Sequence, residues 1–156
     1  MAKGKKAKAR KPAPAPRAPK AVAPEPPRDQ TPLFCFRYAD TGTKNPWRFA
    51  AESDGAGSEI VRFLTDIGRS TWNEIVAMQT GGLRRRHRKH HEMDVTLLDQ
   101  AAQKDLASKR LDEIFGDQIF RFRVSGEKRL WGFRRDRMFH VIWWDPEHRV
   151  YPTEKS

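Results

Sequence analysis

The sequence contains a single cysteine, Cys35, and no long apolar run. One cysteine cannot form an intramolecular disulfide, which is typical of a protein in a reducing compartment. No stretch approaches the roughly 18 apolar residues that a membrane-spanning helix needs. The basic N-terminus is not followed by an apolar segment, so a secretory signal is not expected. These absences predict a cytoplasmic protein that does not engage a membrane.

Several catalytic signatures are absent as well. The sequence has no glycine-rich phosphate loop, no nucleophilic-serine elbow and no cysteine-nucleophile motif. His87, His90 and His91 lie close together, but five Lys or Arg residues surround them and no cysteine is near. Because a cationic setting opposes Zn²⁺ binding, we expect no metal here, and no other cofactor is expected.

The first thirty residues lack aromatic side chains and hold seven of the eleven prolines. They carry nine Lys or Arg against two acidic residues, a net charge of +7 out of +11 for the whole chain. Low hydrophobicity with high charge cannot offset the entropy lost on ordering. We therefore expect a disordered basic arm over 1–30, a single α+β domain over 31–152 and a short tail over 153–156.

A second concentration of positive charge lies between residues 84 and 91. Without the arm and this segment, the remaining chain has a net charge of −1. Charge gathered in two places is typical of a polyanion binder, because each neutralised phosphate releases counterions. The alternative is a solubilising tail with a solvated loop. The residues predicted to bind nucleic acid in this loop are Arg84, Arg85, Arg86, Arg88 and Lys89.

Hydrophobic patterns predict strands near both ends of the foldable part and helices between them. Runs of helices followed by runs of strands are typical of an α+β domain, with helices packed on one face of an antiparallel sheet. Apolar residues at i, i+3, i+4 and i+7 indicate the first helix, and the capping-box pattern of Thr71 and Glu74 indicates the second. The predicted early strands are 33–38 and 47–50, and the predicted helices are 58–68, a second from Thr71 onward, 96–107 and 111–115.

Residues 120–144 predict a three-stranded antiparallel meander. Phe120, Phe122 and Val124 alternate with arginines, which is the period of a half-buried strand. The segment RLWGF (129–133) follows a Ser-Gly turn, and MFHVIWW (138–144) is apolar almost throughout. Such a continuous apolar strand indicates a central position that is covered on both faces.

The run VSGEKRLWGFRRDRMFHVIWWDPEHRVY resembles the C-terminal half of the RelE/ParE toxin superfamily. Arg129 stands where the family's strand arginine falls, and residues 148–151 resemble the family's ending. The segment 143–147 departs from the family's pattern, and the spacing from His148 to Tyr151 is compressed, which affects catalysis more than fold. The resemblance implies a RelE-like α+β fold, action on RNA or the ribosome, and a protein antitoxin as partner.

RNA cleavage without a metal requires a base for the ribose 2′-hydroxyl, cations for the phosphorane and an acid for the leaving oxygen. His148, Arg129 and Tyr151 have these chemical types, and the superfamily's RNA-cutting members use a comparable set. They are the predicted catalytic residues. Arginine forks match phosphate geometry, so neighbouring strand arginines are predicted to bind phosphates as well. These are Arg121, Arg123 and Arg134.

Three functions remain open at this point. The first is an endoribonuclease toxin that acts on mRNA or the ribosome. The second is a non-catalytic nucleic-acid-binding protein on the same fold, with its arm and loop as the binding parts. The third is a toxin that inhibits a topoisomerase through a protein interface. For the individual residues, the structural alternative is that His148 caps a strand end, Tyr151 packs and the arginines form a solvated sheet face.

Overall fold

The computed structural model describes residues 29–42, 44–49 and 55–152. The predicted arm and the predicted tail therefore lie almost wholly outside the described residues. Within these ranges, no helix is long and apolar enough to cross a bilayer. The elements are β1 (Leu33–Cys35), α1 (Ala56–Ile67), α2 (Trp72–Ala77), β2 (Gln79–Thr80), β3 (His87–Arg88), β4 (His91–Asp94), the 3₁₀ helix η1 (Val95–Leu97), α3 (Gln100–Ser108), α4 (Leu111–Phe115), β5 (Gln118–Ser125), β6 (Lys128–Arg135) and β7 (Met138–Asp145).

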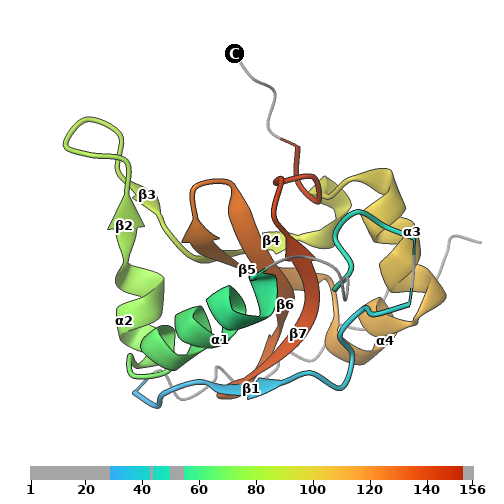
Figure 1. Ribbon diagram of the computed structural model, residues 1–156, viewed down its shortest axis with the longest axis horizontal. Helices are drawn as coiled ribbons and strands as arrows, with labels where there is room; N and C mark the ends of the chain where they lie inside the picture. The colour runs from blue at the N-terminus through green and yellow to red at the C-terminus, as the bar shows by residue number, and fades with distance from the viewer. Residues whose placement is uncertain (1–28, 43, 50–54, 153–156) are drawn as a thin grey trace, which may run out of the picture.

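Five strands form the main sheet in the order β1-β7-β6-β5-β4 (Figure 1). The predicted meander is confirmed as β5, β6 and β7, which pair antiparallel at the centre of the sheet. Strand β4 adds antiparallel to β5, whereas β1 runs parallel to β7. The predicted α+β class is confirmed, but the sheet is mixed because β1 approaches β7 in the parallel direction. Strands β2 and β3 form a separate hairpin that projects from the body.

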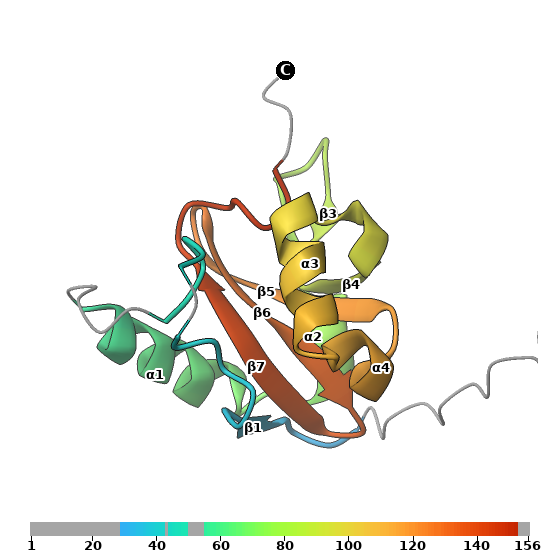
Figure 2. The same cartoon turned by 90° about the vertical axis from the view of Figure 1, so that its right-hand side faces the viewer.

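The core has two parts, one on each side of the sheet. Side chains of α1 and α2 join one cluster with Phe120, Phe122 and Trp144. Side chains of α3 and α4 join the other cluster with Ile119 and Trp143. Figure 2 shows α1 on one side of the sheet and α3 and α4 on the other. The helices therefore do not form the single layer that we expected. The two-sided burial predicted for β7 is what requires a second layer, because successive strand residues point to opposite faces.

The start of α2 follows the sequence signal closely. Thr71 Oγ1 accepts a hydrogen bond from the Glu74 backbone N–H at 3.3 Å, and Glu74 accepts from the Thr71 N–H at 2.7 Å, which completes the predicted capping box. Helix α3 begins later than predicted, at Gln100, because Asp99 rather than Thr96 caps it through the Ala101 N–H at 2.8 Å.

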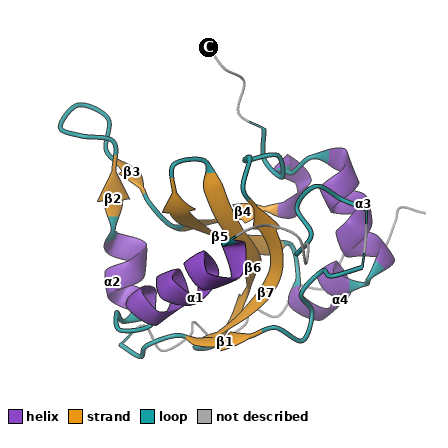
Figure 3. Cartoon of the chain, viewed as in Figure 1, coloured by secondary structure: helices purple, strands orange, loops and turns teal. Residues whose placement is uncertain are grey.

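The predicted return strand over 47–50 is wrong for residues 47–49, which are loop and turn (Figure 3). Trp47 and the earlier residue Asp40 form hydrogen bonds with the bulged part of β7, and residues 47–49 do not pair with β1. Trp47 accepts from the Trp144 N–H at 3.1 Å, and Asp40 donates its N–H to the Ile142 carbonyl at 2.8 Å. A bulge in β7 frees these groups from the ladder, since the register between β6 and β7 shifts at Gly132.

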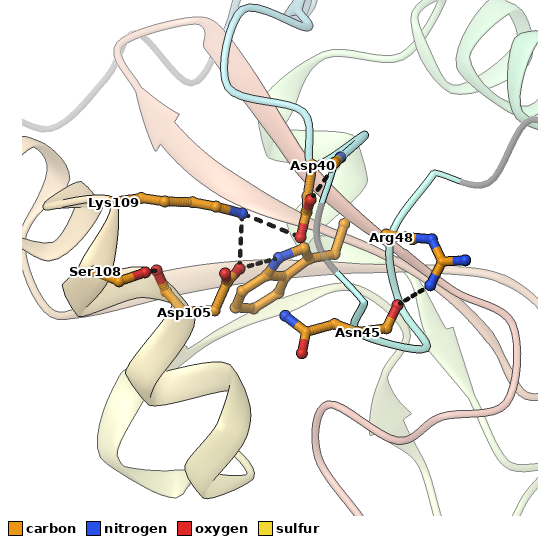
Figure 4. A network of polar contacts seen from close by, with 8 residues as sticks. Asp40, Asn45, Arg48, Asp105, Ser108 and Lys109 are labelled. Atoms are coloured by element: carbon orange, nitrogen blue, oxygen red, sulfur yellow. Dashed lines mark hydrogen bonds and ion pairs between the residues drawn. The ribbon is translucent and has the colours of Figure 1, made fainter.

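A buried polar network fixes this segment against α3 (Figure 4). The Lys109 ammonium lies 3.0 Å from an Asp40 oxygen and 2.9 Å from an Asp105 oxygen. Both carboxylates are buried, and Asp105 also accepts from the Trp143 indole N–H at 3.0 Å. Buried charges persist only when they are paired and hydrogen-bonded. The network therefore holds Asp40, the C-terminal end of α3 and β7 in one arrangement.

Gly132 is the position where the bulge leaves no room for a side chain. A Cβ there would lie 2.1 Å from the His140 carbonyl oxygen, a backbone atom that cannot rotate away. We expect Gly132→Ala to lower the free energy of unfolding by about 3 kcal/mol in urea titrations. Gly57→Ala in α1 is the control, since its Cβ meets no atom within 4 Å and should raise stability by about 0.5–1 kcal/mol. Equal stability of Gly132→Ala and the parent protein would contradict the described bulge.

Candidate active site beside the basic hairpin

A cavity of about 720 Å³ opens where β5 and β6 meet the C-terminal turn and the base of the β2–β3 hairpin. Four parts of the chain contribute to its wall: the hairpin, β4, the two central strands and the turn after β7. We call it the basic cavity. Its wall includes six side chains of the sheet and the C-terminal turn that can bind an anion or transfer a proton: His91, Arg121, Arg123, Arg129, His148 and Tyr151.

Three arginines meet in the basic cavity because of strand period and register. Arg121 and Arg123 are two residues apart on β5, so their side chains share one face. The β5–β6 register places Arg129 directly opposite Arg123. Like charges opposite each other destabilise a sheet. Among residues 29–42, 44–49 and 55–152, no carboxylate forms an ion pair with any of the three.

Burial and mutual repulsion lower the pKa of two of these guanidinium groups. Burial is the largest cause of the lowered pKa of Arg121, and the charge of Arg123 is the second. Burial is also the largest cause for Arg129, followed by the charge of Arg121, and lowers its pKa to about 10. The Nε atoms of Arg121 and Arg129 are buried and have no hydrogen-bond partner in the described part of the chain. Clustered cations with unused donors form a site that a bound anion would complete.

Arg121 lies between two imidazole rings. Its Nη2 is 2.8 Å from His91 Nε2, and its Nη1 is 3.4 Å from His148 Nε2. A guanidinium can only donate, so each facing Nε2 must be the unprotonated nitrogen. The His91 Nδ1–H can then donate to the Glu92 carbonyl at 3.2 Å.

Both histidines are held in the neutral form. Burial is the largest cause of the lowered pKa of His91, followed by the charge of Arg121. Burial also lowers the pKa of His148, followed by the charges of Arg129 and Arg121. At neutral pH each ring therefore has a lone pair available on Nε2, which is the state that a general base needs.

The turn after β7 brings His148 and Tyr151 to the basic cavity. Asp145 is only 1% exposed and accepts from the N–H groups of Arg149 at 2.8 Å and Val150 at 2.9 Å. These bonds curl the chain so that His148 adopts a left-handed backbone with φ of 57°. The rings of His148 and Tyr151 then lie 6.4 Å apart between centroids. A buried carboxylate thus determines where both predicted catalytic side chains stand.

The structure brings most of the predicted site residues together. The wall of the basic cavity includes the predicted catalytic set of His148, Tyr151 and Arg129. It also includes four of the eight residues predicted to bind nucleic acid, namely Arg88, Lys89, Arg121 and Arg123. Arg84, Arg85 and Arg86 do not line it; they lie exposed in the loop of the β2–β3 hairpin.

Arg134 is the exception, since it lies on the other face of the sheet. Its guanidinium carbon is 4.8 Å from the centre of the Trp72 ring, and its Nε is 3.7 Å from a Glu92 carboxylate oxygen. The expectation that it shares a surface with Arg129 is wrong because the two are five residues apart on one strand. An odd separation puts strand side chains on opposite faces.

His91 was not among the predicted site residues, because the sequence places it in a run of neighbouring histidines and basic residues that resembles a loop. His91 is the first residue of β4 and pairs with Arg121 across the sheet. His90, one residue earlier, faces the other way and is fully buried beside Phe63 and Phe122. The alternation of His91 and Met93 was the signal that could have found this strand. No group of three potential metal ligands occurs within the described ranges.

Comparison with protein-family models, with curated proteins and with solved structures finds no match for this chain. The function is therefore inferred from the geometry of the basic cavity and from the charges around it.

Buried His90 makes the protein sensitive to acid. Burial, followed by the charges of Lys89 and Arg121, lowers its pKa from 6.5 to about 3. Between these values the unfolded chain binds more protons, so the free energy of unfolding should fall as pH drops below 6.5, by about 1.4 kcal/mol per pH unit from this group. Urea titrations from pH 7.5 to pH 5 measure the slope.

The matched variant for this test is His90→Asn. The His90 Nδ1 accepts from the Arg123 N–H at 3.0 Å, and an asparagine oxygen can take the same place. The variant should be less stable than the parent at pH 7.5, because it fills less of the core, but its stability should depend less on pH. An unchanged pH slope in His90→Asn would show that another group causes the acid sensitivity.

Proposed function

We propose that this protein is a metal-independent endoribonuclease of the RelE/ParE toxin type, acting in the cytoplasm on mRNA or on RNA at the ribosome. The observation that carries the proposal is the convergence of His148, Tyr151 and Arg129 with Arg121 and Arg123 in one cavity. Residues from separate parts of the chain supply every chemical type that such a reaction needs. The resemblance of the C-terminal run to the toxin superfamily supports the same reading.

The arginine cluster is the phosphate-binding part of the proposed site. A phosphodiester bound among Arg121, Arg123 and Arg129 takes up their unused N–H donors and offsets their mutual repulsion. During transphosphorylation a second negative charge develops on the phosphorane. Donors that are already in place stabilise this charge without reorganising, which is the largest catalytic effect in many enzymes.

Proton transfer completes the proposed reaction. Neutral His148 takes the ribose 2′-hydroxyl proton on Nε2 while the 2′-oxygen forms a bond to phosphorus. The bond from phosphorus to the 5′-oxygen breaks, and an acid in the cavity gives its proton to that oxygen; Tyr151 has the chemical type predicted for this step. The products are a 2′,3′-cyclic phosphate and a 5′-hydroxyl. DNA has no 2′-hydroxyl, so this site binds DNA but does not cut it.

The β2–β3 hairpin is the proposed entry path for the RNA backbone. Its loop carries Arg84, Arg85 and Arg86, all exposed, and its base connects to the basic cavity through a bond from Arg123 Nη1 to Thr80 Oγ1 at 3.1 Å. Positive charge therefore continues from the hairpin to the arginine cluster. Affinity along such a path falls with salt, because binding releases counterions from the phosphates.

The toxin assignment implies a partner with the opposite charge. An acidic antitoxin that covers the basic cavity would neutralise the three arginines and block access to His148. A second candidate function is non-catalytic nucleic-acid binding, because the charge of the hairpin loop lies outside the basic cavity and can hold RNA whether or not catalysis occurs.

Cleavage of single-stranded RNA in the presence of EDTA tests the proposal. The parent protein should generate 2′,3′-cyclic phosphate ends, and His148→Gln should slow single-turnover cleavage by about 10²–10⁴-fold with RNA affinity nearly unchanged, because only the base is lost. The triple change Arg84→Gln, Arg85→Gln and Arg86→Gln is the control. It should weaken binding and flatten its salt dependence, yet leave the rate at saturating RNA intact. Tight binding without any cleavage by the parent protein would favour the non-catalytic binder.

A further inference from the structure

The geometry of the basic cavity points to a second proton-transfer residue, and we propose that His91 on β4 acts as the general acid opposite His148. Arg121 lies between the two rings and acts as the positioning residue that they share. This inference rests on the proposed ribonuclease function and deepens it, because it replaces Tyr151 as the acid and defines the active site as a pair of histidines about one arginine.

Two separate elements hold the imidazoles against one guanidinium. His91 pairs with Arg121 across β4 and β5, and the next pair on the same face, Met93 with Ile119, is buried in the core. His148 arrives from the turn that Asp145 fixes. The contacts of 2.8 Å and 3.4 Å join Arg121 to residues 30 and 27 positions away in the chain, so that one guanidinium brings the two histidines together.

His91 is also better fixed than Tyr151. Both ring nitrogens of His91 have partners, Arg121 at Nε2 and the Glu92 carbonyl at Nδ1. Within the described residues, no hydrogen bond holds the Tyr151 hydroxyl, and its ring contacts the edge of His148. The hydrogen bond from Nδ1–H to the Glu92 carbonyl raises the pKa of His91, although burial and then the charge of Arg121 lower it more in the free protein.

The charged groups around each ring explain how His148 can act as the base and His91 as the acid. His91 faces Arg88, Arg121 and Arg129. His148 faces Arg121 and Arg129, with Asp145 and Glu127 partly offsetting them. In the free protein these cations keep both rings neutral. A bound phosphodiester offsets the same cations and accepts the Arg121 donors, which frees both Nε2 atoms and lets one ring take up a proton.

The reaction then balances without a metal or a water molecule. His148 Nε2 removes the 2′-hydroxyl proton, and the 2′-oxygen bonds to phosphorus. As the bond from phosphorus to the 5′-oxygen breaks, protonated His91 gives its Nε2 proton to the leaving oxygen. The RNA ends as a 2′,3′-cyclic phosphate and a 5′-hydroxyl, and the enzyme ends with the proton on His148 instead of His91. Proton exchange with water restores the starting state.

The experiment uses two RNA substrates that differ only at the cleaved bond. One has the natural 5′-oxygen and the other has sulfur in that position, a leaving group that needs no acid. Single-turnover rates are measured for the full-length parent protein and for His91→Gln, His148→Gln and Tyr151→Phe, with RNA affinity and unfolding recorded for each. His91→Asn serves as a second variant in case His91→Gln does not fold.

We expect His91→Gln to cut the natural RNA at least about 10²-fold more slowly than the parent, and to cut the sulfur-containing RNA at nearly the parent's rate. His148→Gln should be slow on both substrates, and any loss of rate in Tyr151→Phe should be the same on the two substrates. The parent's rate should also fall as the pH rises through the pKa that His91 has in the RNA complex, and His91→Gln should lack this fall. Two results together distinguish an acid from a merely structural histidine. The variant regains its rate on the sulfur-containing RNA, and its rate on natural RNA no longer falls as the pH rises.

Other outcomes overturn the inference in distinguishable ways. A normal rate for His91→Gln on natural RNA removes His91 from catalysis while the ribonuclease function stands. Sulfur rescue of Tyr151→Phe but not of His91→Gln assigns the acid to Tyr151. If the parent protein cuts neither substrate, the proposed ribonuclease function is wrong, and His91 and His148 are then not an acid–base pair.

Discussion

The constraint on which the site depends is the repulsion among three arginines that share one face of the central strands. Arg121 and Arg123 share that face by strand period, and Arg129 joins them by register. No described carboxylate pairs with them, and two of the three have a lowered guanidinium pKa. An arrangement that costs stability persists when the surrounding structure over-determines it, and such sites are characteristically functional.

The surrounding structure does over-determine it. The meander is buried on both faces, so neither β5 nor β6 can slip by one residue without exposing a row of aromatic side chains. The bulge at Gly132 and the Asp40, Lys109 and Asp105 network fix β7 and the segment that crosses it. Asp145 then fixes the turn that carries His148. The energy that holds the arginines together thus comes from packing and buried hydrogen bonds away from the basic cavity.

Sequence patterns predicted those parts of the fold that depend on local periodicity. The meander, the capping box at Thr71 and the short helix over 111–115 follow from such signals and are confirmed. The parallel pairing of β1 with residues 138–140 and the hydrogen bonds of the Trp47 loop beside the bulge are long-range interactions, which no local pattern encodes. At the site, the chemistry of the residue types identified side chains that the fold brings together. Arg134 is not among them, because its odd separation from Arg129 along β6 places it on the other face of the sheet. His91 was missed because its role appears only when β4 pairs with β5.

The most direct test of the account is to measure stability and RNA affinity together in Arg123→Gln. Arg123 donates to Thr80 but makes no ion pair with a described carboxylate, so its charge contributes repulsion rather than stabilisation. If the arginines repel one another, Arg123→Gln unfolds at the same or a higher urea concentration than the parent protein. Its affinity for single-stranded RNA falls severalfold. A variant that loses stability and binds RNA as tightly as the parent would contradict the account, because the arginine cluster would then be part of the scaffold.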